Sequence, residues 1–178
     1  MLCDEHTISR EFVALREPAA LEAFQEASND GRRTTVLKLI DGGVNVNQSI
    51  LDRETALFDA IRGGDEELFS ALLDRGANPN LRSRGGTPLT VAAGQGRNDF
   101  ARVLLDHGAQ VDAADEDGRT SLTIAAMRGN LKLVQLLLQH AADVAHTDNK
   151  GKTAAAYAEE EGYREITAML ASKSNARQ

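Results

Sequence analysis

Glycine recurs at almost constant intervals along the 178-residue chain, and this spacing limits the possible folds more than any other feature. Gly31, Gly64, Gly96, Gly129 and Gly162 are separated by 33, 32, 33 and 33 residues. Two further sets keep the same phase: Thr55, Thr87, Thr120 and Thr153, and Ala27, Ala60, Ala92, Ala125 and Ala158. Three sets of markers in phase over five periods indicate a real repeat. A period of this length predicts a stacked array of small units, each of which buries its hydrophobic face against its neighbours.

One repeat can be interpreted from local physical chemistry. Thr87 is a typical N-cap, and Pro88 follows at the first helical position, where a missing N–H has no cost. Gly96 ends this first helix, and a second apolar helix ends at Gly108. Residues 110–119 are rich in Asp and Gly, which predicts an exposed turn. The sequence therefore predicts that each period forms a helix, a turn, a second helix and a loop.

The segment Thr87-Pro88-Leu89-Thr90-Val91-Ala92 resembles the T-P-L-H-x-A signature of the ankyrin repeat, and Thr120-Ser121-Leu122-Thr123-Ile124-Ala125 follows the same pattern. The resemblance covers about residues 18–172. It implies an all-α ankyrin-repeat solenoid of five helix-turn-helix units joined by short β-hairpin-like loops. The units are expected at about residues 20–47, 55–80, 87–112, 120–145 and 153–172.

Both ends of the array depart from the signature. In the second helix of the fifth unit, Arg164 and Thr167 replace Leu131 and Val134 of the fourth. An end unit has no outer neighbour, so polar residues there predict a C-terminal cap. Residues 1–17 form an extension, with a short docked helix at about 7–16 or a disordered segment as the alternatives. Residues 173–178 are expected to be a frayed tail.

Composition narrows the class of partner. The formal net charge of −7 disfavours binding to nucleic acid. No apolar run approaches the ~20 residues needed to cross a bilayer, so membrane insertion is not expected. A single cysteine, Cys3, cannot form an internal disulfide. These features favour a cytoplasmic protein, with a nuclear or host-cell location left open, that is monomeric when free.

Short segments that resemble catalytic or metal-binding motifs are explained by the repeat itself. Gly151-Lys152-Thr153 resembles the end of a phosphate-binding loop, but His146 stands where that motif requires glycine. His107 and His140 occupy equivalent repeat positions, which places them about 8–10 Å apart. That separation is too large for one zinc ion. We therefore expect no catalytic residues, no metal and no cofactor, and the chain is not predicted to be an enzyme.

The resemblance implies a non-catalytic interaction module, an adaptor, targeting subunit or inhibitor, whose partner is another protein lying along the concave surface of loop tips and first helices. The positions carried over are Leu51, Asp52, Glu54, Arg62, Arg82, Arg84, Gln95, Glu116, Asp117, Arg119, Met127, Arg128, Asn149, Lys150 and Lys152. Leu51 and Met127 are candidate apolar anchors. Arg82, Arg84 and Arg128 are candidates to receive an acidic segment. The alternative is that these charges are ordinary solvated side chains and that Leu51 packs on Ile50.

Two other functions are consistent with the same residues. Ankyrin repeats can be hydroxylated at a connector asparagine, and Asn80 and Asn47 match that position, so the chain could be a substrate of asparagine hydroxylation. A secreted effector that acts by binding host proteins is a further alternative. A homo-oligomeric structural role is also consistent with the sequence.

Overall fold

The computed structural model describes residues 18–48 and 54–175. The predicted helix at about 7–16, the tip residues Leu51 and Asp52, and the last three residues lie outside the described residues. The chain divides into two compact units, Met1–Asn78 (unit 1) and Pro79–Gln178 (unit 2). Each unit is described by itself below.

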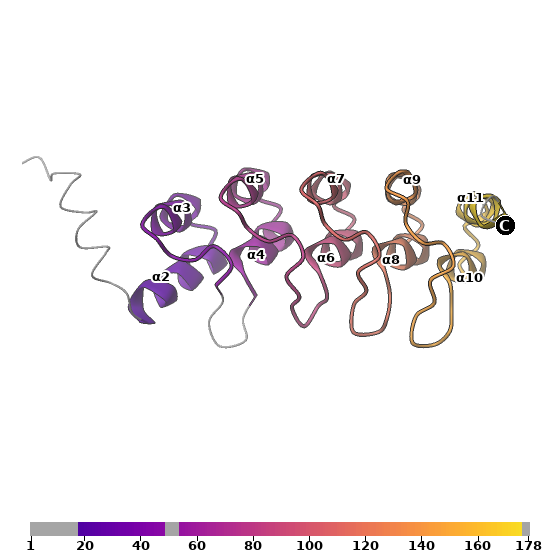
Figure 1. The fold of residues 1–178 in the computed structure, drawn as a ribbon, viewed down its shortest axis with the longest axis horizontal. Helices are drawn as coiled ribbons and strands as arrows, with labels where there is room; N and C mark the ends of the chain where they lie inside the picture. Colours follow the sequence, from indigo (N-terminus) through magenta and orange to yellow (C-terminus); the bar gives the residue numbers. More distant parts are fainter. Residues whose placement is uncertain (1–17, 49–53, 176–178) are drawn as a thin grey trace, which may run out of the picture. The chain divides into compact units, whose positions relative to one another are not determined.

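The described residues form ten helices arranged as five successive pairs, in agreement with the predicted all-α repeat (Figure 1). Unit 1 contains α2 (Pro18–Asn29), α3 (Arg33–Asp41), α4 (Ala56–Gly63) and α5 (Glu66–Asp74). Unit 2 contains α6 (Pro88–Gly94), α7 (Asn98–Asp106), α8 (Ser121–Met127), α9 (Leu131–Gln139), α10 (Ala154–Glu160) and α11 (Arg164–Asn175). The only β-type pairing in these ranges is three isolated bridges, Ser83 to Gly86, Ala114 to Thr120 and Thr147 to Thr153, all in loops.

Within each unit the helices form two layers. First helices pack on first helices, as α6 on α8 and α8 on α10, and second helices pack on second helices, as α7 on α9. The loops leave from the side of the first helices (Figure 1). The repeat thus places the loops between successive helix pairs of a unit along one edge.

Threonine side chains cap the first helices of unit 2, as the sequence predicts, whereas Thr55 at the start of α4 makes no such hydrogen bond. Thr87 Oγ1 accepts a hydrogen bond from the Thr90 amide, and Thr90 Oγ1 accepts one from the Thr87 amide at 2.8 Å. This reciprocal capping box satisfies two N–H groups at the helix start. The Thr120 and Thr153 side chains cap α8 and α10 by accepting from the amides of Thr123 and Ala156, without the reciprocal bond.

Residues in the left-handed conformation follow the second helices. The positions are Gly43, Gly76, Gly108 and Ala141, with φ of 103°, 83°, 81° and 62°. Glycine adopts positive φ without a steric penalty from Cβ, whereas alanine does not. Ala141 is therefore a local exception to the repeat, and it is the only residue other than glycine with positive φ in the described ranges.

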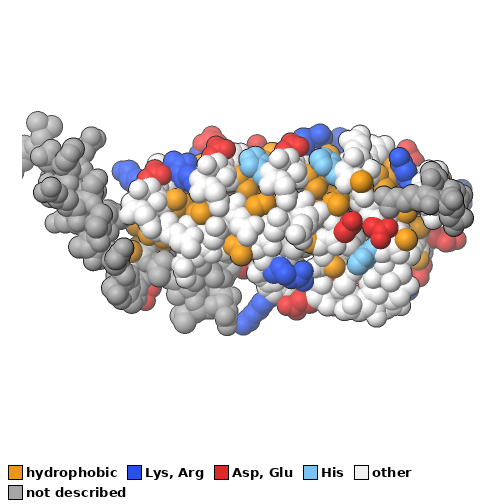
Figure 2. Space-filling model, in the orientation of Figure 1, with side chains coloured by type: hydrophobic (Ala, Val, Ile, Leu, Met, Phe, Trp, Pro, Cys, Tyr) orange, Lys and Arg blue, Asp and Glu red, His pale blue; other side chains and the backbone are white. Residues whose placement is uncertain are grey.

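The core consists of aliphatic side chains, a few aromatic rings and small alanines. Phe24, Phe58 and Phe69 are its largest members in unit 1, and Leu104, Leu122 and Leu133 are fully buried in unit 2. Tyr163, 36% exposed, is the one large hydrophobic side chain that lies open to solvent within residues 18–48 and 54–175. Charged side chains of both signs are dispersed over the face drawn in Figure 2, with hydrophobic atoms in small areas between them. A partner that meets this face therefore meets charged and polar groups with only small hydrophobic areas between them.

The final pair has the character of a cap, with one correction to the predicted boundary. Ile166 and Leu170 are buried, whereas Arg164 is exposed and Thr167 is partly exposed where the equivalent Val134 is buried. The helix α11 continues to Asn175, so residues 173–175 are helical and the prediction of a frayed tail from residue 173 is wrong for them. Residues 173–175 include no glycine that would end the helix. The Ser172 hydroxyl donates to the Met169 carbonyl within the last turns.

Candidate functional site

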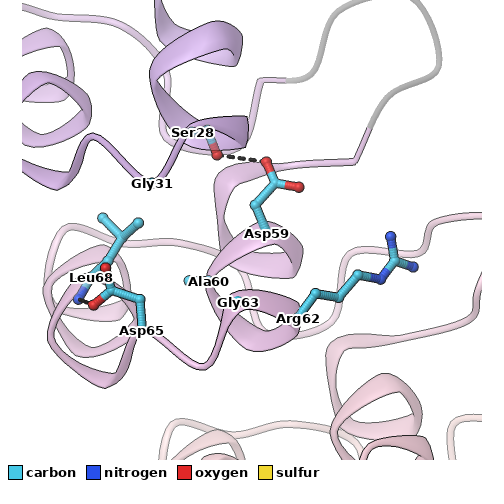
Figure 3. Close-up of a pocket in the computed structure, with 8 residues that line it drawn as sticks. All are labelled: Ser28, Gly31, Asp59, Ala60, Arg62, Gly63, Asp65 and Leu68. Atoms are coloured by element: carbon cyan, nitrogen blue, oxygen red, sulfur yellow. Dashed lines mark hydrogen bonds between the residues drawn. The ribbon is translucent and has the colours of Figure 1, made fainter.

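A surface pocket of about 380 Å³ lies in unit 1, at the ends of α2 and α4 and the start of α5 (Figure 3). Its lining is Ser28, Gly31, Asp59, Ala60, Arg62, Gly63, Asp65 and Leu68. The Ser28 hydroxyl, on a residue only 4% exposed, donates to Asp59 Oδ2 at 2.5 Å. Asp65 caps α5 by accepting from the Leu68 amide at 2.9 Å. The pocket therefore combines an acidic wall with open space.

Two predicted site residues of unit 1 bind each other. Arg62 Nη2 donates to Glu54 Oε1 at 2.7 Å, and a second ion-pair contact joins Arg62 Nη1 to Glu54 Oε2. The Glu54 side chain is only 14% exposed. In Figure 3 the Arg62 side chain extends away from Ser28 and Asp59. The Arg62 guanidinium therefore binds a carboxylate of its own unit.

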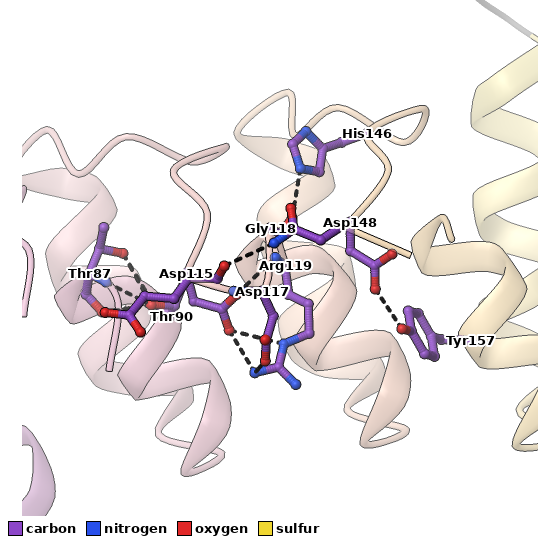
Figure 4. Close-up of polar contacts among 11 residues, drawn as sticks. Thr87, Thr90, Asp115, Asp117, Gly118, Arg119, His146, Asp148 and Tyr157 are labelled. Atoms are coloured by element: carbon purple, nitrogen blue, oxygen red, sulfur yellow. Dashed lines mark hydrogen bonds and ion pairs between the residues drawn. The ribbon is translucent and has the colours of Figure 1, made fainter. Parts of the chain in front are cut away.

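In unit 2, one aspartate organises the loop before α8 (Figure 4). Asp115 Oδ1 accepts from the amides of Asp117 and Arg119, at 3.0 and 2.9 Å. Asp115 Oδ2 accepts from Arg119 Nε at 3.0 Å, and Asp117 forms a second ion pair with Arg119 at 2.7 Å. The hydrogen bond that Arg119 donates to Asp115 is the main reason that the pKa of Arg119 is raised. The predicted site residues Arg119 and Asp117 therefore hold the loop together.

Asp148 has the same place in the loop before α10. Its Oδ1 accepts from the amides of Lys150 and Lys152, at 2.9 and 3.0 Å. Its Oδ2 accepts from the Tyr157 hydroxyl at 2.5 Å, in place of an arginine (Figure 4). That hydroxyl, assisted by the backbone amides, lowers the pKa of Asp148. The same hydrogen bond and burial raise the pKa of Tyr157.

These two loops are joined edge to edge. The Asn149 amide donates to the Asp117 carbonyl at 3.0 Å, and Asn149 Nδ2 donates to the Glu116 carbonyl at 2.9 Å. His146 Nε2 forms a hydrogen bond with the Gly118 carbonyl at 2.9 Å. The side chain of Asn149, predicted as a partner-binding residue, is therefore part of this inter-loop contact.

Lys152, another predicted site residue, is engaged inside the last repeat. Its Nζ donates to both carboxylate oxygens of Glu160, at 2.7 and 2.8 Å, and lies 5.2 Å from the centre of the Tyr157 ring. Exposed ion pairs of this kind contribute little to stability. They do fix the direction of the side chain.

Four predicted residues of unit 2, which we call the tip surface, present side chains to solvent. Arg82, Gln95, Glu116 and Arg128 are exposed. Their side chains make no hydrogen bond or ion pair with any other residue that the structure describes. Arg84 and Lys150 are also exposed, whereas Met127 is half-buried. The tip surface is the part of the predicted site that remains open to a partner.

The connector asparagines have a structural role in each unit. Asn47 Oδ1 accepts from the Asn78 amide at 2.7 Å, and Asn47 Nδ2 donates to the Gly76 carbonyl at 3.2 Å. Asn80 makes the equivalent bonds to the Gln110 amide at 2.8 Å and the Gly108 carbonyl at 3.0 Å. Hydroxylation of these residues stays a prediction.

The sequence-based site includes Arg62 of the pocket but not Ser28 or Asp59, and it does not include the loop aspartates Asp115 and Asp148. Asp115 and Asp148 are 33 residues apart, so the repeat spacing itself was a signal that could have identified them. Among residues 18–48 and 54–175, no group of three His, Cys, Asp or Glu side chains is placed to hold a metal ion. None of the described helices is long and apolar enough to cross a membrane.

Comparison with known proteins agrees with this repeat architecture. A family model for ankyrin repeats (3 copies) matches residues 24–115 and 108–178. Ankyrin repeat and KH domain-containing protein 1 from Homo sapiens is 34% identical over 99 residues, 54% of this chain and 4% of that protein. A putative ankyrin repeat-containing protein from Treponema pallidum (strain Nichols) is also 34% identical over 99 residues, 54% of this chain and 33% of that protein.

Glycerophosphocholine phosphodiesterase gde1 from Schizosaccharomyces pombe is 36% identical over 85 residues, 47% of this chain but 8% of that protein. The chain thus spans at most a third of the length of each of these three relatives. The activity named for the yeast protein belongs to that protein. Because the family model covers nearly all of the described repeats, the chain belongs to the ankyrin-repeat family.

Proposed function

We propose that the chain acts by binding another protein and that the tip surface of unit 2 is a principal contact. Ankyrin repeats are general protein-interaction modules. The observation that supports the proposal is that some of the predicted residues bond within the chain, whereas others face solvent. Arg119, Asp117 and Lys152 are engaged in holding the loops, whereas Arg82, Gln95, Glu116 and Arg128 are directed to solvent.

The chemistry of the tip surface favours a polar partner segment. Two of its four side chains are arginines, which bind carboxylates through two parallel hydrogen bonds. Arg84, two residues after Arg82, is also exposed. An acidic segment of the partner is therefore the expected counterpart. We propose an adaptor, targeting or inhibitory role in the cytoplasm on this basis, with no reaction catalysed by the chain.

A pull-down from the native source tests the proposal. The test variant is Arg82→Glu/Arg128→Glu, which reverses charge on the tip surface. The matched control is Arg97→Glu/Arg102→Glu, which reverses the same charges at exposed positions of the second-helix layer. Circular dichroism establishes that both variants are folded.

A partner that is lost with the first variant and retained with the second supports the proposal. A partner that is retained with both variants places binding elsewhere on the chain and contradicts the assignment to the tip surface. Equal loss with both variants contradicts it as well, because it indicates a response to net charge alone.

A further inference from the structure

The contact between the loops 108–120 and 141–153 of unit 2 has a donor side and an acceptor side. Asn149 donates from its backbone amide and its side chain to the carbonyls of Asp117 and Glu116. His146 Nε2 lies 2.9 Å from the Gly118 carbonyl, toward which its ring is directed in Figure 4. A carbonyl oxygen can only accept, so Nε2 carries the proton. Three successive carbonyls of one loop are thus covered by donors of the next.

The equivalent carbonyls one repeat later are open. A shift of 33 residues leads from the three bonded carbonyls to those of Asn149, Lys150 and Gly151. These three residues are exposed, and their carbonyl groups make no hydrogen bond with any residue that the structure describes. We call these three residues the open loop edge. Its backbone therefore presents the acceptors of the preceding contact without the donors.

The space that a donor side chain needs is also present at this edge. A Cβ atom on Gly118 would lie 2.5 Å from Asn149 Oδ1, because the asparagine side chain fills the space beside that glycine. A Cβ atom on Gly151 would meet nothing within 4 Å. The two glycines have similar φ, 77° and 74°, so the backbone has the same local form at both places. The open loop edge therefore has room for a side chain placed as Asn149 is.

The backbone of the open loop edge is held in position from within its own repeat. Asp148 accepts hydrogen bonds from the amides of Lys150 and Lys152 and from the Tyr157 hydroxyl. The carbonyls between these amides are thus fixed in direction. Exposed rows of backbone groups without partners are the sites where segments of other chains add by main-chain hydrogen bonding.

We propose that the open loop edge binds a loop of a partner protein that presents an asparagine. The backbone amide and the Nδ2 group of that asparagine donate to the carbonyls of Lys150 and Asn149, and a donor three residues earlier in the partner reaches the Gly151 carbonyl. The occupant is argued from continuity, since Asn149 and His146 cover the preceding loop in this way. The inference rests on the proposed protein-binding function and adds a contact separate from the tip surface.

A loop is favoured over a stacked pair of helices as the occupant. Arg164 is exposed and Thr167 partly exposed on α11, where the equivalent Val134 of α9 is buried. A further helix pair packed on α11 would bury these polar groups. A loop that meets residues 149–151 leaves them in solvent.

A titration followed by ¹⁵N–¹H NMR on the full chain tests this assignment. The probe is a head-to-tail cyclic peptide with the sequence of residues 145–153, which contains the donors of the preceding contact. The matched control is the same cyclic peptide with the change Asn149→Ala. Saturable shifts are expected for the amides of Lys150, Gly151 and Lys152 with the first peptide. The control peptide is expected to bind about fivefold more weakly, because it lacks one donor.

Two variants of the full chain separate the open loop edge from backbone strain. Gly151→Ala places a Cβ atom where the partner asparagine must lie, and it is expected to abolish saturable binding of the cyclic peptide. Gly162→Ala is the matched control, because Gly162 also has φ of 77° and open space around its Cβ position, but lies between α10 and α11. This variant should bind normally. Circular dichroism establishes that both variants are folded.

The proposal is overturned if the cyclic peptide gives no saturable shifts, if the control peptide binds equally well, or if Gly151→Ala binds as the unmodified chain does. Equal loss of binding in Gly151→Ala and Gly162→Ala also overturns it, because that result indicates a response to strain. None of these variants changes the tip surface. Conversely, the tip variant Arg82→Glu/Arg128→Glu keeps the open loop edge and should bind the cyclic peptide normally. The two proposals therefore fail separately.

Discussion

The loops 108–120 and 141–153 of unit 2 occupy equivalent places in successive repeats, yet they are stabilised differently. The first begins with Gly108 and closes with Arg119 on Asp115, and the next loop packs against it through Asn149. The second begins with Ala141 and closes with Tyr157 on Asp148. The shared backbone hydrogen bonds of Asp115 and Asp148 show what the repeat requires. The differences at the start of each loop and in the residue that closes it show which contacts can vary between repeats.

The sharpest contrast is between Gly118 and Gly151, which have φ of 77° and 74°. A Cβ on Gly118 would lie 2.5 Å from Asn149 Oδ1 and 2.9 Å from its backbone nitrogen, whereas a Cβ on Gly151 meets nothing within 4 Å. We expect Gly118→Ala to lower the free energy of unfolding by about 3 kcal/mol, from backbone strain and overpacking together. Gly151→Ala should cost about 1 kcal/mol from strain alone.

Urea denaturation of the two variants measures this difference. Equal losses of stability would show that the inter-loop contact does not restrict Gly118. The double variant Gly118→Ala/Asn149→Gly serves as a control, because removing the Asn149 side chain should recover part of the loss at Gly118.

The closing contact of the second loop is tested by Tyr157→Phe. The change removes one hydrogen bond to Asp148 and keeps the buried ring, so the free energy of unfolding should fall by about 1 kcal/mol. Chemical denaturation near neutral pH gives the value. An unchanged midpoint would mean that the amides of Lys150 and Lys152 are sufficient to hold Asp148.

The same contact predicts a pH dependence at both extremes. The pKa of Asp148 is lowered from 3.8 in the folded chain, so its contribution is present above that value and is lost as the pH falls below it. The pKa of Tyr157 is raised from 10, so its contribution is present below pH 10 and is lost as the pH rises further. Stability measured against pH should fall less steeply at both ends in Tyr157→Phe than in the unmodified chain. Parallel curves would contradict the linkage.

The smallest expected effect on stability is at the first residue of each loop. Ala141→Gly relieves a left-handed backbone that costs alanine about 1 kcal/mol, and it loses part of this gain through the greater freedom of glycine in the unfolded chain. A net gain of about 0.5 kcal/mol is expected, measured by thermal unfolding. The reverse change, Gly108→Ala, should destabilise, and a loss on both substitutions would show that Ala141 has a packing role.

The helices and their caps could be predicted from the sequence because they depend on local chemistry. Thr87, Pro88 and the periodic glycines act through their own backbone and the next turn, and the repeat confirms each by recurrence. The role of Arg119 could not be predicted in this way. Its partners become neighbours only when the loop closes, so an arginine expected to meet a partner is found on Asp115 and Asp117.

The pocket of unit 1 was beyond sequence reasoning for a related reason. Ser28 and Asp59 are 31 residues apart and belong to different repeats. Only the stacking of α2 on α4 joins them. Comparison of equivalent positions could have flagged them as polar where other repeats are apolar, but it could not have shown open space beside them.

The hydrogen bonds that Asn149 makes to Glu116 and Asp117 have a consequence for binding thermodynamics. The backbone of both loops is ordered before any partner arrives, so association should lose little conformational entropy there. Side chains at positions 116 and 150 can then be exchanged to suit a different partner without changing the frame that presents them. A fold of this kind separates the evolution of specificity from the maintenance of stability.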